Sequence, residues 1–219
     1  MFERCSGLTT FDLSNFYTSQ VTNMGSMFSG CSKLSSLDVS NFDTSKVINT
    51  NCMFRDCSQL SSLDVSNFKT SNAIDMGGMF WGCSNLSSLN LSKFDTSKVT
   101  HLGVMFAGCS QITSLDLSNF ETSSANNMDG MFNGCSELSS LNLSNFDTSK
   151  VTIMRNMFSN CSKLEYINLK NFIENTSLTI DNIFKNIPDN VAVCLNEESS
   201  KLLGEIKKKN CYSLDCSDD

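Results

Sequence analysis

Hydrophobic and polar positions repeat along the chain with a period of 26 residues. Met-Phe pairs begin at residues 1, 27, 53, 79, 105, 131 and 157, and Ile183-Phe184 is a degenerate eighth copy. Cys-Ser pairs recur at the same interval from Cys5 to Cys161. The spacing never slips, so no repeat carries an insertion that could form a specialised loop. Such self-similarity is typical of a solenoid.

Each repeat predicts a short strand followed by a short helix. Residues 34–39 read L-x-x-L-x-V, a period-two alternation that favours a strand. Thr44-Ser45 is then expected to cap a helix. Residues 99–109 place apolar side chains at steps of three and four, which predicts one buried helical face. Gly, Asn or Asp usually precedes the repeated cysteine, and these residue types tolerate the left-handed backbone of a helix end.

A single repeat cannot fold alone, because its few apolar side chains do not offset the entropy of ordering 26 residues. The repeats are therefore expected to stack into one α/β solenoid of parallel short strands and short helices. We expect about seven to eight coils over residues 1–185, wound with a right hand. Met1-Phe2 lies in the middle of a repeat, so the chain is expected to be a fragment whose targeting segment was left out.

Residues 186–219 depart from the repeat and predict a capping strand–helix–strand segment. The stretch VAVCL continues the sheet with Val193 and Leu195 inward, and EESSKLLGEIKKKN predicts an amphipathic helix. The stretch CYSLDC is expected to supply a last strand. Cys194 then falls in an outward position and Cys211 and Cys216 in inward ones, and the pattern leaves open whether they form a disulfide.

The motif MFxxCSxLxSLDLSNFDTSKVTNM resembles the 26-residue repeat of the BspA-like leucine-rich-repeat surface proteins. The resemblance covers residues 1 to about 185 and implies a cell-surface, secreted or lipid-anchored protein used in adhesion or host contact. The chain departs from ordinary leucine-rich repeats at Phe42 and its equivalents, where an asparagine or cysteine would usually stand. An asparagine lies one place earlier, as at Asn41, which leaves its role in an inter-coil ladder open.

Composition and chemistry argue against a catalytic function. The chain has 16 basic and 23 acidic residues and a net charge of -7, so a nucleic-acid partner is not expected. No apolar run is long enough to span a membrane. His101 is the single histidine, and we expect it to be an exposed surface residue. No catalytic triad, metal-binding Cys-x-x-Cys pair or cofactor motif is present, and the repeated cysteines are expected to be buried free thiols.

The outward strand positions are the candidate binding face. They form three parallel polar rows, a central row of Asp or Asn between two rows of Ser. We expect neighbouring carboxylates in the central row to raise each other's pKa. The candidate residues are Ser36, Asp38, Ser40, Ser62, Asp64, Ser66, Ser88, Asn90, Ser114 and Asp116.

Two interpretations of this face remain open. In the first, the domain is a non-catalytic cell-surface or secreted module that binds a protein or glycan on a host or neighbouring cell, with weak calcium affinity at most. In the second, the face is merely solvated and the domain is a structural spacer or stalk that projects another domain from the cell. A specific site should concentrate non-repeat residues in one patch, whereas a spacer should have equivalent coils.

Overall fold

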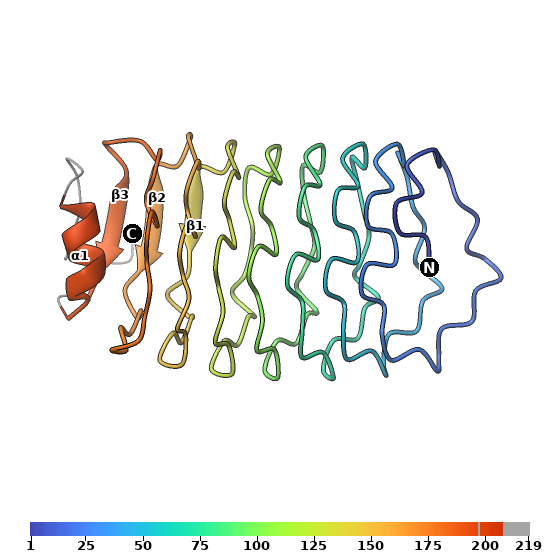
Figure 1. The fold of residues 1–219 in the computed structure, drawn as a ribbon, viewed down its shortest axis with the longest axis horizontal. Helices are drawn as coiled ribbons and strands as arrows, with labels where there is room; N and C mark the ends of the chain where they lie inside the picture. Colours follow the sequence, from blue (N-terminus) through green and yellow to red (C-terminus); the bar gives the residue numbers. More distant parts are fainter. Residues whose placement is uncertain (197, 208–219) are drawn as a thin grey trace.

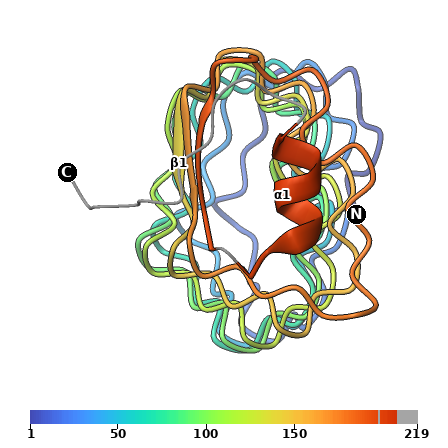
Figure 2. The same ribbon diagram turned by 90° about the vertical axis from the view of Figure 1, so that its left-hand side faces the viewer.

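The chain forms a rod of stacked coils, seen in a computed structural model that describes residues 1–196 and 198–207 (Figure 1). Viewed along the rod, successive coils superpose on one another (Figure 2). Equivalent residues of neighbouring coils pair in parallel at an offset of 26, as Asn23 with Asn49 and Ser140 with Tyr166. The repeat solenoid expected from the sequence is therefore present.

Regular strands form only toward the C-terminal end of the rod. They are β1 (Ser140–Asn142), β2 (Tyr166–Leu169) and β3 (Ala192–Leu195), which pair in parallel in the order β1-β2-β3. In earlier coils the equivalent segment is extended but sparsely bonded; Ser35 N–H, for example, donates to Thr9 O at 3.3 Å. The alternation of inward and outward residues is nevertheless as predicted, with Leu34, Leu37 and Val39 buried.

The prediction of a short helix in every coil is wrong. Residues 99–109 and their equivalents form consecutive tight turns, and the only helix in the described residues is α1 (Ser200–Ile206). Two residues of each such segment have a positive φ, as Ser26 (55°) and Gly30 (75°) do. The second of these is the position before the cysteine, where the left-handed backbone was predicted; the first was not anticipated.

These turns carry the main inter-coil hydrogen-bond ladder. In the coil containing Met24, alternate backbone N–H groups donate to the next coil, for example Met24 to Asn49 O at 2.8 Å and Phe28 to Met53 O at 2.9 Å. Isolated parallel bridges join the same segment along the rod from Asn23 to Thr179. Turns can replace the helix because the next coil accepts the backbone hydrogen bonds that a helix would make internally.

The core is a stack of identical layers. Phenylalanine rings of successive coils lie nearly parallel, with the Phe54 and Phe80 centroids 5.9 Å apart. The repeated cysteines, which we call the column cysteines, are free thiols; they are Cys5, Cys31, Cys57, Cys83, Cys109, Cys135 and Cys161. From Cys31 onward each thiol donates to a phenylalanine carbonyl of the preceding coil, as Cys83 does to Phe54 O at 3.1 Å.

Buried threonines bond successive coils rather than capping helices. The Thr96 hydroxyl donates to Glu121 O at 2.9 Å, and Glu121 N–H donates to the same hydroxyl at 2.8 Å. Thr44 makes the same pair of bonds with Lys69. The expected helix cap at Thr44-Ser45 is therefore wrong, because the hydroxyl satisfies backbone groups of the next coil.

The C-terminal end of the rod is covered by α1 (Figures 1 and 2). Leu202 and Ile206 of this helix are fully buried, as are Val193 and Leu195 of β3. Cys194 pairs with Asn168 and so continues the Asp/Asn column as predicted, but it is buried and disulfide-bonded. The expected last strand, with Cys211 and Cys216, lies outside the described residues, and the division at residue 185 stays a prediction. No helix in the described part is long and apolar enough to cross a membrane.

Candidate binding face

The three polar rows lie together on the outer side of the coils, as the sequence predicted. Nine of the ten candidate residues are exposed, and Ser66 is half-buried. The leucine and valine side chains between them point into the core, where Leu63 and Val65 are 7% and 1% exposed. The face therefore presents only hydroxyl, carboxylate, amide and backbone groups over successive coils.

The Asp and Asn residues of the central row terminate each extended segment. Asp38 Oδ1 accepts a hydrogen bond from the Ser40 backbone N–H at 2.9 Å, and Asp64 Oδ1 accepts one from Ser66 N–H at 2.9 Å. Asn90 Oδ1 takes the same role toward Ser92 N–H at 3.2 Å. These are Asx-turns, which aspartate and asparagine make equally well. This role explains why the row mixes the two residue types, and the recurring D-x-S motif could have revealed it.

The carboxylates of the row are held in the ionised form. Hydrogen bonds from the Ser40 hydroxyl and backbone N–H lower the pKa of Asp38 below its usual value, and the charge of Asp64 opposes this only weakly. Hydrogen bonds from the Ser66 side chain and backbone likewise lower the pKa of Asp64. The predicted increase from a neighbouring carboxylate is present as a minor effect of Asp64 on Asp38, and the hydrogen bonds to the charged form outweigh it.

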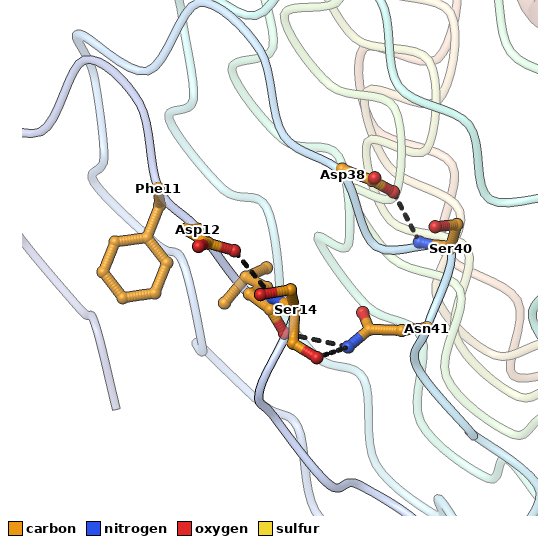
Figure 3. Close-up of a pocket in the computed structure, with 7 residues that line it drawn as sticks. Phe11, Asp12, Ser14, Asp38, Ser40 and Asn41 are labelled. Atoms are coloured by element: carbon orange, nitrogen blue, oxygen red, sulfur yellow. Dashed lines mark hydrogen bonds between the residues drawn. The ribbon is translucent and has the colours of Figure 1, made fainter.

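The face is hollowed between coils. One hollow of about 220 Å³ lies between Asp12 and Asp38 and is bounded by Phe11 and Asn41 (Figure 3). A second, of about 370 Å³, lies between Asp64 and Asn90. Phe11 lines the first hollow, so an aromatic ring borders the polar rows there. Polar groups therefore line recesses that could receive the side chains or sugar rings of a larger partner.

An asparagine ladder runs along one border of the face. Asn67 Nδ2 donates to the Val39, Ser40 and Phe42 carbonyls of the preceding coil at 3.0, 3.1 and 3.2 Å. Asn41, Asn119, Asn145 and Asn171 make corresponding bonds. The asparagines therefore form an inter-coil ladder, although they stand one place earlier than in ordinary leucine-rich repeats.

The ladder side chain is interrupted once among these coils. Lys93 stands where Asn67 and Asn119 stand in the neighbouring coils, and it makes no hydrogen bond or ion pair within the described residues. Next to it lies a third hollow of about 380 Å³, whose lining includes Phe68, Lys69, Lys93 and Asp95. Sequence analysis did not single out these residues.

The single histidine lies on the opposite side of the rod and is half-buried, not exposed as expected. Its Nδ1 is 3.1 Å from Asp75 Oδ1. This hydrogen bond raises the pKa of His101 against the effect of burial. Burial raises the pKa of Asp75, but bonds from His101, Gly77 and Asn51 outweigh it and lower the pKa overall. The ring occupies space left by Gly77, whose added Cβ would lie 2.5 Å from it.

Other non-repeat residues gather on the same side. The Arg55 guanidinium lies 3.8 Å from the centroid of the Trp81 ring, and its Nε is 3.1 Å from Asp56 Oδ2. Ile48 and Ile74 are 44% and 45% exposed on adjacent coils. The charged groups of this patch are paired within the chain, so it offers neither strong charge nor a grouping of reactive side chains.

Nothing in the described residues brings together three or more His, Cys, Asp or Glu side chains in a way that could hold a metal ion. On the candidate face, the carboxylates alternate with amides after Asp64, so few charged ligands converge at one point. Calcium prefers six to eight oxygen ligands.

Comparisons with known proteins place the chain among repeat sequences. The sequence model of a family described as "Mycoplasma protein of unknown function, DUF285" matches residues 1–110 and again residues 83–192. This match runs along the repeats. It confirms the resemblance to the BspA-like repeat that the sequence motif indicated. No curated protein matches the chain.

One solved structure with a significant match is described as a leucine-rich repeat protein from Bacteroides ovatus ATCC 8483. The two chains are 20% identical with a TM-score of 0.46. The match covers 89% of this chain, which spans 57% of the length of that structure.

Proposed function

The chain belongs to the DUF285 family, whose description states no function, and we propose that it is a non-catalytic repeat domain that binds a macromolecular partner through its three polar rows. The proposed setting is the cell surface or the secreted fraction, and the proposed role is adhesion to a host or neighbouring cell. The resemblance to BspA-like surface proteins supports the setting. The chemistry of the face supports the binding role.

The observation that carries the proposal is the repetition of one polar group at a fixed orientation. The Asx-turns hold Asp12, Asp38 and Asp64 in equivalent positions on three successive coils. Each remains exposed, and each has a lowered pKa, so the row is negatively charged at neutral pH. Groups that are held in place before binding lose little freedom on contact.

The partner should be basic or rich in hydroxyl groups. Carboxylates accept hydrogen bonds only, whereas the flanking serine hydroxyls both donate and accept. A protein with spaced Lys or Arg side chains, or a glycan with many hydroxyls, would match several coils at once. Individual contacts would be weak, and the affinity would come from their number. Calcium would bind weakly at most.

The test is a binding screen followed by a charge-neutral variant. An array of glycans and matrix proteins identifies a ligand, and Asp38→Asn/Asp64→Asn is then compared with the native chain. Asn90 already occupies this row and makes the Asx-turn, so the substitution keeps the backbone and removes two charges. We expect a loss of affinity of at least ten-fold at low salt, and a smaller loss at high salt.

Asp147→Asn is the matched control. This aspartate makes the same Asx-turn to Ser149 N–H at 2.9 Å but stands outside the three rows. Because the control removes one charge and the double variant removes two, a loss of binding free energy about half as large in the control would point to net charge alone. Binding unchanged in the double variant would count against the proposed face.

A spacer role is the second candidate, and the inter-coil bonds favour it. Threonine, asparagine and thiol side chains each bond one coil to the next along the rod, and phenylalanine rings stack through the core. Such a rod resists bending and could project another domain. A spacer predicts no ligand in the screen and no effect of Asp38→Asn/Asp64→Asn, so the same experiment separates the two functions.

A further inference from the structure

The interruption of the asparagine ladder at Lys93 leaves backbone acceptors without their usual donor. By the 26-residue repeat, an asparagine at this position would reach the Val65, Ser66 and Phe68 carbonyls. Within the described residues, Val65 O accepts only the Phe68 N–H, and no donor reaches Ser66 O or Phe68 O. The corresponding Phe42 and Phe94 carbonyls accept bonds at 3.2 and 2.7 Å.

The Phe68 carbonyl lies in a residue that is only 2% exposed. This carbonyl has no donor within the described residues, so a polar ligand that supplies one gains a hydrogen bond on binding. The hollow of about 380 Å³ beside it falls in the size range of small-molecule sites, about 300–1,000 Å³. The missing ladder side chain thus coincides with an open recess lined by two residues, Ser66 and Phe68, whose carbonyls accept no hydrogen bond within the described residues.

Two ammonium groups border the same hollow. Lys69 and Lys93 both line it, both are exposed, and neither makes an ion pair within the described residues. Lys69 interrupts a position that is Asp43 and Asp95 in the coils on either side. The Lys69 charge is among the causes that lower the pKa of Asp43, and Asp95 itself lines the hollow. The site therefore combines two cations, one carboxylate and unpaired carbonyl oxygens.

We propose that this hollow binds an acidic sugar, a glycan residue that carries a carboxylate beside several hydroxyls. The carboxylate would pair with Lys69 and Lys93, and the hydroxyls would donate to the Ser66 and Phe68 carbonyls and to Asp95. An acidic protein side chain supplies the carboxylate but has no adjacent hydroxyl donors, so it fits the site less completely. The inference rests on the proposed function, because it assigns a ligand class to one border of the same face.

Lys93→Asn is the decisive variant, because it restores the residue found at the neighbouring positions. The new amide should bond the free carbonyls, fill the hollow and raise the melting temperature, a result that needs no ligand. Affinity for a uronic-acid oligosaccharide, measured by isothermal titration, should fall at least ten-fold relative to the native chain. Lys150→Asn removes an equal charge two coils away and should change affinity less than two-fold.

Chemically modified forms of the oligosaccharide test the role of its carboxylates. The same oligosaccharide with its carboxylates reduced to alcohols should bind at least ten-fold more weakly. Three results would overturn the inference. Lys93→Asn could bind the uronic-acid oligosaccharide as tightly as the native chain does, the reduced oligosaccharide could bind as tightly as the acidic one, or the native chain could fail to bind the acidic oligosaccharide. Stronger binding of an acidic peptide than of the sugar would overturn it in favour of a protein ligand.

Failure here and failure of the proposed function are distinguishable. Asp38→Asn/Asp64→Asn leaves Lys69 and Lys93 in place and should retain the acidic-sugar site even if the rows bind nothing. If Lys93→Asn has no effect on any ligand while the aspartate variant loses binding, the rows act and the hollow does not.

Discussion

The buried threonine bonds should contribute measurably to the stability of the rod, and Thr96→Val tests this. Valine has nearly the same shape as threonine but cannot accept or donate a hydrogen bond. The substitution removes the 2.9 Å bond to Glu121 O and the 2.8 Å bond from Glu121 N–H. Thr96 is 1% exposed, so water cannot easily replace the lost hydroxyl.

Each of the two bonds contributes about 0.5–1.5 kcal/mol net, and an unsatisfied buried partner costs about 1–3 kcal/mol. The extra buried methyl group returns roughly 0.8 kcal/mol. The free energy of unfolding should therefore fall by about 1–3 kcal/mol. With a urea dependence of about 2–3 kcal/mol/M, the midpoint moves by roughly 0.5–1 M.

Urea unfolding followed by circular dichroism measures the midpoint, and hydrogen exchange of the Glu121 amide gives the local effect. The amide should exchange at least ten-fold faster in the variant. Thr113→Val makes the same chemical change at an exposed position without a side-chain bond and should stay within about 0.5 kcal/mol of the native chain. A Thr96→Val midpoint equal to that of Thr113→Val would refute the reasoning.

Three other predictions follow from the side chains on the opposite side of the rod and in the core. The pKa of His101 is raised by Asp75, so its stabilising effect is complete below the unfolded value of about 6.5 and is lost as pH rises through the higher folded value. The urea midpoint of the native chain relative to His101→Asn should accordingly be higher at pH 5.5 than at pH 9, and an equal difference at both would contradict this. Gly77→Ala should destabilise the rod by about 1–3 kcal/mol through overlap with the His101 ring, whereas Gly7→Ala, which meets nothing within 4 Å, should not. The double variant Gly77→Ala/His101→Ala should recover part of the loss, and additive effects would show that the overlap is not the cause. Burial raises the pKa of the Cys57 thiol to about 12, so the fully buried column cysteines should resist alkylation in the native state while the half-buried Cys5 and Cys52 react first. Mass spectrometry of the labelled peptides decides the order, and most of the eleven cysteines should react once the chain is denatured without reductant.

The repeat period and the inward positions could be predicted from the sequence because both follow from one-dimensional spacing. Leu34, Leu37 and Val39 are buried as their alternation indicates. Helices were predicted because apolar residues recur at steps of three and four in residues 99–109. Consecutive tight turns produce the same spacing, and the choice between them depends on the next coil, which accepts the backbone bonds.

The rows of the candidate face were predictable, but the structural role of their aspartates was missed. The strand alternation predicts that Asp38 is an exposed charge, but not that its Oδ1 closes an Asx-turn. The hollows were not predictable, because their shape depends on how side chains of different coils lie beside one another. The hollow at Lys93 had one sequence signal, the replacement of an asparagine in an otherwise constant position.

The central claim is that equivalent carboxylates on successive coils engage one partner together. The most direct measurement is the affinity for the ligand found in the screen, across the series Asp12→Asn, Asp12→Asn/Asp38→Asn and Asp12→Asn/Asp38→Asn/Asp64→Asn. All three variants keep the Asx-turns, so circular dichroism and melting temperature should match the native chain. We predict that affinity falls at each step, by at least ten-fold over the full series. A triple variant that folds normally and binds as tightly as the native chain would contradict the account.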